Sequence, residues 1–194
     1  TFDPDLRITP AEGKTFIPDS TTLFLLAKTD GVDCYSLCLE ENALLKYGEK
    51  QYIATIKGVD ENYVRVTGID SSMWDGEFIL RSEQGRPYAI PGIGIANFLG
   101  LRINFITPLV IYVPRRTGTI EMTAEDAFVR NYIFPSGIYQ VEQEYDSKYV
   151  FMPISFAREL LEFDSEVTSI EIKFRTGYPE AEIQKNVVRL FGEG

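Results

Sequence analysis

The sequence predicts an α+β fold of two lobes, in which a mostly β lobe is inserted into a discontinuous β-α-β lobe. The first and last thirds of the 194 residues alternate strand patterns with helix patterns, while the middle third is richer in strand patterns. Apolar residues make up 44% of the chain and aromatic residues 13%, enough to build a core. We place the discontinuous lobe at residues 1–74 and 147–194 and the inserted lobe at 75–146.

In the first third, short alternating or β-branched runs predict strands at 6–8, 32–39 and 51–57. Asp19 and the Ser and Thr residues after it are typical N-caps, so we expect a helix from there to about Gly31. Residues 40–47 fit either a short helical turn or one arm of a hairpin. This third therefore indicates a helix packed on a sheet.

The middle third has strand patterns at 78–80, 88–90, 106–113 and 127–134, a helix pattern at 95–99, and a turn at 135–137. The last third predicts a strand at 148–152, a helix at 153–163 with Ser155 as its N-cap, a half-buried strand at 167–174 and an amphipathic helix at 180–191. This return to alternation is the reason for expecting an inserted lobe.

The absence of histidine restricts the chemistry most. It excludes Ser-His-Asp and Cys-His nucleophile systems, histidine zinc sites and the HExxH metalloprotease helix. Adjacent carboxylates such as 40–41, 60–61 and 125–126 point to opposite faces if they lie on strands, and no aspartic protease elbow is present. We therefore predict that the chain is not an enzyme and has no catalytic residue, cofactor site or metal site.

Two motifs invite a functional interpretation and have simpler ones. Gly92 and Gly94 resemble a nucleotide-binding loop, but the third glycine is replaced by Asn97, so a tight strand-to-helix turn explains them. Glu142, Glu144 and Asp146 would share one face of a strand and suit a hard cation, yet solvated loop positions are the simpler interpretation.

The net charge of −10 makes nucleic acid and anionic lipid poor partners. This charge fits either general solubility or an acidic face that meets a partner protein. Cys34 and Cys38 would lie about 13 Å apart along a strand, whereas a disulfide needs Cα atoms within roughly 7 Å. We expect both thiols to be free and buried.

Residues 87–114 carry one charged side chain, Arg102, but four prolines interrupt them, so we expect strands there and no membrane span. The chain lacks an initiator Met and a signal-like segment, and we expect it to be part of a longer protein. Residues 115–121 lie between two predicted strands. They form either an ordinary hairpin or a protruding contact element, with Arg115, Arg116, Thr117, Gly118 and Glu121 as candidate partner-binding residues.

Several short runs occur in an order that resembles the LolC/LolE-type lipoprotein-releasing permeases, within the MacB-like periplasmic core domain superfamily. The runs are residues 31–32, 56–60, 76–79, 91–101, 134–137, 146–157 with Leu160 and Leu161, and 167–172. The run at 91–101 is similar to the family's "G-x-x-L-A-x-x-L-G-L" helix, and 134–137 resembles its "G-I-F-x-S-G" turn. The resemblance covers residues 30 to 175.

This resemblance implies a periplasmic domain of an inner-membrane ABC-transporter permease, with a Porter-like lobe interrupted by a Sabre-like lobe. Its partners would be a cytoplasmic ABC ATPase, a second permease chain and a periplasmic carrier or adaptor. In the lipoprotein-releasing branch a hairpin of the inserted lobe hooks the carrier, and the equivalent position here is residues 114–125. Two departures are the absence of the hook's apolar tip and the replacement of the family's "G-D" by residues 102–104.

Other interpretations remain open at this point. The same scaffold serves in peptide or small-molecule export, or in the regulation of a cell-wall hydrolase. A different class would be a stand-alone carboxylate-dependent hydrolase or a ligand-binding protein.

Overall fold

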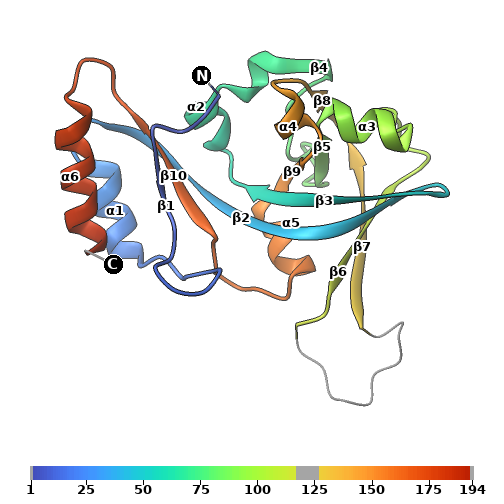
Figure 1. The fold of residues 1–194 in the computed structure, drawn as a ribbon, viewed down its shortest axis with the longest axis horizontal. Coiled ribbons are helices and arrows are strands. Elements are labelled where there is room, and N and C mark those ends of the chain that lie inside the picture. Colours follow the sequence, from blue (N-terminus) through green and yellow to red (C-terminus); the bar gives the residue numbers. More distant parts are fainter. Residues whose placement is uncertain (1, 117–126, 193–194) are drawn as a thin grey trace. The chain divides into compact units, whose positions relative to one another are not determined.

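The computed structural model describes residues 2–116 and 127–192 (Figure 1). The chain divides into two compact units, each made of separate segments. Unit 1 consists of Thr1–Leu39, Val59–Gly68 and Ser165–Gly194, and unit 2 of Glu40–Gly58 and Ile69–Asp164. The predicted lobes, with boundaries at 75 and 146, divide the chain differently, and that division stays a prediction.

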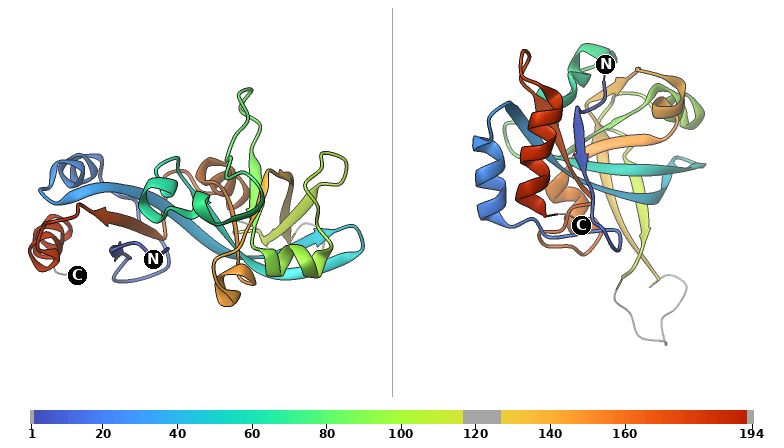
Figure 2. Two further views of the ribbon diagram at one scale, coloured as in Figure 1. Left: turned by 90° about the horizontal axis from the view of Figure 1, so that it is seen from above. Right: turned by 60° about the vertical axis from the view of Figure 1, so that its left-hand side comes forward.

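Unit 1 is a three-stranded antiparallel sheet with helices. Its elements are β1 (Leu6–Ile8), α1 (Ser20–Lys28), the first half of β2 (Val32–Tyr47), α2 (Tyr63–Thr67), β10 (Ser169–Phe174) and α6 (Glu180–Phe191). β10 lies between β1 and β2. Helices α1 and α6 lie side by side (Figures 1 and 2). The Asp19 carboxylate caps α1 by accepting from the Thr22 N–H at 2.9 Å, as the sequence predicted.

The prediction that 167–174 is half-buried with one polar face is wrong. Ser169 and Glu171 are both buried, because β10 is the central strand of this sheet and α2 packs on it. The buried Glu171 carboxylate pairs with the Arg7 guanidinium of β1 at 3.1 Å. Glu171 is thus a buried carboxylate whose partner, Arg7, is partly exposed, and it does not belong to a solvent-facing side of the strand.

One carboxylate fastens β2 to the segment that leads into α2. Asp60 accepts the Ser36 hydroxyl at 2.7 Å, the Leu37 N–H at 2.9 Å and the Asn62 N–H at 3.0 Å. Hydrogen bonds to an ionised acceptor are among the stronger ones in proteins. They fix the turn with which the chain re-enters unit 1 after β3.

Unit 2 holds the second half of β2, nearly all of β3 (Lys50–Val59) and the middle of the chain. Its other elements are η1 (Ile69–Ser72), β4 (Met73–Gly76), β5 (Tyr88–Pro91), α3 (Ile93–Leu99), β6 (Leu109–Pro114), β7 (Phe128–Pro135), β8 (Gly137–Tyr139), α4 (Gln143–Asp146), β9 (Tyr149–Pro153) and α5 (Ile154–Leu160). β4 and β8 form a small sheet of their own.

The main sheet of unit 2 closes on itself. Its strands follow the order β2-β3-β9-β5-β7-β6, and β6 pairs again with β2, where Leu45 lies opposite Ile111. The inward side chains include Leu45, Ile111 and Ile133, all buried. Closure removes most free strand edges, which is how a small β-structure avoids unwanted pairing.

Residues 40–47 form one arm of a hairpin, the second of the two predicted alternatives, because β2 continues through them and pairs with β3 after the turn at 48–49. Two other local predictions in unit 2 are wrong. Residues 78–80 form no strand, and the strand lies earlier, at β4. Ser155 does not cap α5: Pro153 occupies the cap position, and the Ser155 hydroxyl accepts from the Arg81 guanidinium.

The two glycines before α3 are required by close packing. A Cβ on Gly92 would collide with the backbone of Asp146, and one on Gly94 would collide with the Ser147 hydroxyl. The two positions therefore let α3 lie against the end of α4. This supports the interpretation as a tight strand-to-helix turn.

The two cysteines lie on β2 in unit 1, and both are buried and outside any disulfide, as predicted. Burial, with a smaller effect of the Asp33 carboxylate, raises the pKa of the Cys34 thiol. Its reactive thiolate form is therefore disfavoured. In the part of the chain that the structure describes, no helix has the length and apolar character that a membrane crossing requires.

Tyr139 of β8 is a buried phenol in unit 2, and its hydroxyl lies 2.9 Å from the Tyr145 carbonyl oxygen and 3.1 Å from that of Tyr149. Burial, and next the Asp146 carboxylate, raise its pKa well above the usual range for tyrosine. The phenol therefore stays a donor to these carbonyls.

We expect Tyr139→Phe to lower the free energy of unfolding by about 1–2 kcal/mol at pH 7, since the variant loses the buried hydrogen bonding of the hydroxyl to these two carbonyls. Because the folded-state pKa is raised, this stabilisation is complete below the unfolded pKa of about 10 and is lost as the pH rises above it. Urea unfolding from pH 7 to 11 should thus show wild type and variant converging. Tyr132→Phe, which removes an exposed hydroxyl, is the control. A variant as stable as wild type at pH 7 would contradict this role.

Candidate functional site

The candidate site lies in unit 2, at the end of the paired strands β6 and β7 that is next to residues 117–126. We call this end the hairpin base. These strands pair from Leu109 opposite Ile133 to Pro114 opposite Phe128, and the Arg115 N–H donates to the Ala127 carbonyl at 2.8 Å. A hairpin is therefore present where the sequence indicated one. Of the candidate partner-binding residues, Arg115 and Arg116 are described, while Thr117, Gly118 and Glu121 lie outside the described residues.

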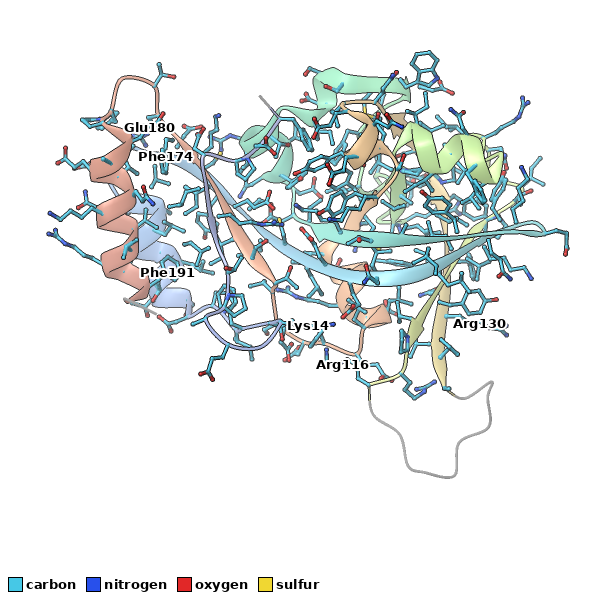
Figure 3. The ribbon with its side chains drawn as sticks, in the orientation of Figure 1. Lys14, Arg116, Arg130, Phe174, Glu180 and Phe191 are labelled. Atoms are coloured by element: carbon cyan, nitrogen blue, oxygen red, sulfur yellow. The ribbon has the colours of Figure 1, made fainter. Side chains whose placement is uncertain are left out.

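Both described arginines are bound by the segment that follows α5. The Arg115 guanidinium forms an ion pair with Glu162 at 3.0 Å, and the other Glu162 oxygen accepts the Arg116 N–H at 3.2 Å. The Arg116 guanidinium stacks on the Phe163 ring, 3.8 Å from its centroid. We call these four residues the hairpin clamp; Figure 3 labels Arg116 just after β6. The clamp joins the hairpin base to the end of α5.

Glu162 has an unusual backbone conformation for its residue type. Its φ of 56° is left-handed, and among the described residues other than glycine it alone has a positive φ. The Glu162 N–H donates to the Glu159 carbonyl and the Phe163 N–H to the Arg158 carbonyl, which is the Schellman pattern that normally places glycine here. A non-glycine residue in this region costs roughly 1–3 kcal/mol. The carboxylate that binds both arginines offsets that cost.

We expect the two shortened variants of Glu162 to differ. Glu162→Ala loses the clamp contacts and keeps the backbone cost, so it should unfold about 0.5–1 kcal/mol more easily than wild type. Glu162→Gly loses the same contacts but removes the cost of a positive φ at a non-glycine residue, so it should be about 1 kcal/mol more stable than the alanine variant. Urea unfolding of both variants measures this. Equal stability of the two would contradict the backbone argument.

A second feature of unit 2 is a row of aromatic side chains on the outer face of β7. Ring centroids lie 5.9 Å apart for Tyr88 and Phe105, 6.0 Å for Phe105 and Phe134, and 6.5 Å for Tyr132 and Phe134. Phe105 is 57% exposed, Tyr132 63% and the adjacent Ile106 88%. A contiguous exposed apolar group of this kind is typical of a contact surface.

The aromatic row borders a groove of about 540 Å³, lined by Arg86, Pro87, Phe105, Asn131, Tyr132, Ile133, Phe134, Phe156 and Glu159. A second hollow of about 520 Å³ lies elsewhere in unit 2, between Trp74, the end of α3 and Arg102. Trp74 is 65% exposed there.

Glu142, Glu144 and Asp146 do not share one face of a strand, and Asp146 is not at a solvated loop position either. Gln143–Asp146 is the short helix α4, and the buried Asp146 carboxylate accepts the Val141 N–H at 2.9 Å. Among the described residues, no group of three or more Asp, Glu or Cys side chains is arranged to hold a metal ion. Asp146 therefore has a local role in the backbone that leads into α4.

Sequence reasoning missed Glu162 and Phe163. They lie 47 residues from the arginines that they bind, and both were treated only as the end of a helix pattern. The one available signal was the absence of glycine after Leu161, where a helix stop favours it. The aromatic row was missed because it joins strand β7 to the loop of Phe105.

No family model matches the chain, and a search of the curated proteins found no match. Three solved structures resemble it. The first is the extracellular domain of the noncanonic ABC-type transporter YknZ from Gram-positive bacteria, with a TM-score of 0.65 and 13% sequence identity over 93% of this chain and 84% of that one. The second is the periplasmic region of MacB from Actinobacillus actinomycetemcomitans, with a TM-score of 0.60 and 14% identity over 88% of this chain and 71% of that one. The third is a domain of a putative permease protein from Porphyromonas gingivalis, with a TM-score of 0.50 and 11% identity over 86% of this chain and 67% of that one.

The chain has the fold of the MacB periplasmic region. This confirms the predicted α+β fold class, with a large sheet and few helices. At 11–14% identity the likeness concerns the fold, and the LolC/LolE-type resemblance of the short sequence runs is a separate and finer claim.

Proposed function

We propose that this chain is the non-catalytic extracytoplasmic domain of an ABC-transporter permease, located on the periplasmic side of an inner membrane. The observation that carries the proposal is the fold likeness to the YknZ extracellular domain, which extends over 93% of this chain and 84% of that one. The residue composition supports it, since a chain without histidine lacks the commonest acid–base catalyst.

In this role the domain relays motion that a cytoplasmic ABC ATPase drives, and a second permease chain completes the membrane part. The closed sheet of unit 2 suits a relay, because closure by the β6–β2 pairing resists local deformation. A rigid body transmits a rotation or a shift without absorbing it.

The partner on the extracytoplasmic side would be a periplasmic carrier or adaptor, and the transported material a lipoprotein. The hairpin of β6 and β7 is the proposed contact element, with Arg115, Arg116, Thr117, Gly118 and Glu121 as its contact residues. Contacts at Arg115 and Arg116 support it: they stiffen the hairpin base, and pre-organisation of a contact element reduces the entropy lost on binding. Export of a peptide or small molecule, or regulation of a cell-wall hydrolase, would use the same scaffold.

The reading frame that encodes this chain provides the first test. We expect apolar spans of about 20 residues on both sides of the domain and a product that fractionates with membranes together with an ATPase subunit. A complete secreted product without such spans would overturn the proposal in favour of a binding protein or hydrolase.

The contact role of the hairpin is tested by changing Arg115, Arg116 and Glu121 together to alanine. We expect the variant to retain an identified periplasmic carrier or adaptor about tenfold less well than wild type in a binding assay with purified proteins. Arg65→Ala, at an exposed arginine of unit 1, is the matched control. Equal binding by the variant and wild type would remove the hairpin residues as the contact.

A further inference from the structure

Strand β7 has an edge that is only partly covered. On one side it pairs with β6 along Phe128–Ile133, and on the other β5 reaches only Phe134 and Pro135. β5 does not extend further along β7 because the residue before it, Pro87, forms an isolated antiparallel β-bridge with Arg81 instead. Over 128–132, no strand in the described parts of the chain covers the second side of β7.

The backbone of this edge is oriented for pairing. In an antiparallel pair, hydrogen-bonded and non-hydrogen-bonded positions alternate. Because the Arg115 N–H donates to the Ala127 carbonyl, the odd-numbered residues of β7 face β6, and the even-numbered residues 128, 130 and 132 direct their N–H and C=O groups outward. Two hydrogen bonds support this assignment of the even-numbered residues to the side away from β6. The Ser136 N–H donates to the Ala89 carbonyl of β5, and the Tyr132 N–H donates to the neighbouring Asn131 side chain at 2.8 Å.

Two residues of this edge, Asn131 and Tyr132, line the groove of about 540 Å³ described above. Phe105, Phe134 and Phe156 of α5 line it as well. A strand that extended β5 alongside β7 would therefore run next to this groove. We call Phe128–Tyr132 together with this groove the open edge of β7.

The charge of this surface selects its occupant. Arg86 lines the groove and Arg130 lies along β7 (Figure 3), both exposed, while Glu159 is the carboxylate of the lining. These three described side chains sum to one positive charge, in a chain whose net charge is −10. A segment with a carboxylate is attracted here, and a basic segment gains less.

We propose that the open edge of β7 binds an extended segment of a partner protein as an added β-strand, one that alternates apolar residues with Asp or Glu. Its backbone would pair with residues 128 and 130 and with the Tyr132 carbonyl, its apolar side chains would pack on Tyr132 and Phe105, and its carboxylate would lie opposite Arg130. The proposal stands apart from the transport role and from the clamp residues.

A second copy of this chain fits the edge less well. Two copies carry −10 each and repel, and a two-fold pairing centred on Arg130 would place two guanidinium groups opposite each other. A single charge on an edge strand is a common protection against self-pairing. The same charge favours an acidic partner strand.

The experiment uses a fluorescently labelled ten-residue probe peptide that alternates Val or Thr with Asp. Fluorescence anisotropy with this chain should show saturable binding. A peptide with Lys in place of Asp, and one with alternate N-methylated amides, should each bind at least about tenfold more weakly, since they lack the charge match and the strand hydrogen bonds.

Arg130→Pro removes an outward N–H without touching the β6 pairing and should weaken binding of the Asp peptide by about tenfold or more. Arg130→Ala, which keeps the N–H, should weaken it less. Tyr132→Ala tests the aromatic row independently of the strand backbone, and circular dichroism checks the fold of each variant.

Three outcomes would overturn the proposal. One is no saturable binding of the Asp peptide, and another is equal binding of the N-methylated and unmodified peptides. The third is a concentration-dependent dimer, measured by sedimentation, that Arg130→Pro abolishes; it would assign the edge to a second copy. Failure of the carrier-binding test at Arg115, Arg116 and Glu121 would leave this result unaffected, because the peptide assay uses neither the carrier nor the membrane part.

Discussion

The pairing of β6 with β2 is the constraint on which the functional surfaces of unit 2 depend. Three residue pairs, Leu44 with Tyr112, Leu45 with Ile111 and Lys46 with Val110, close the sheet and fix the register of β6. Since β7 takes its register from β6, the same pairs decide which side chains of β7 face inward. A shift of one residue would bury Arg130 and Tyr132 and expose Ile133. Closure therefore sets both the hydrophobic core and the aromatic row.

Much of the local structure could be predicted from the sequence, because its signals are local. The Asp19 cap, the β-branched run of β3 and the glycine stop after α3 depend on neighbours within a few residues. Predictions failed where contacts with distant segments of the chain determine whether a residue is buried. The polar residues of β10 are buried because Arg7, more than 160 residues away, supplies a partner for Glu171.

The candidate site shows the same contrast between local signals, which could be predicted, and contacts from distant segments, which could not. The arginines 115 and 116 stand out in the sequence as a charged pair between two strands, and the structure does place a hairpin there. Their partners could not be predicted, because Glu162 binds them through a left-handed backbone that a sequence pattern assigns to glycine. The open edge of β7 could not be predicted from the sequence either, since it depends on where β5 begins and not on any residue of β7.

The clamp and the open edge act on the same two strands, and this bears on how contacts would be transmitted. β7 is held by β6 along most of its length and by β5 at its last residues, while the clamp holds the opposite end of β6 to α5. A strand added at 128–132 would border β7 and Phe156 of α5, and Glu162 lies two residues beyond the end of that helix. The two surfaces would thus be connected through α5 and the segment that follows it. Because close-packed interiors transmit strain, a load applied at one surface would be felt at the other.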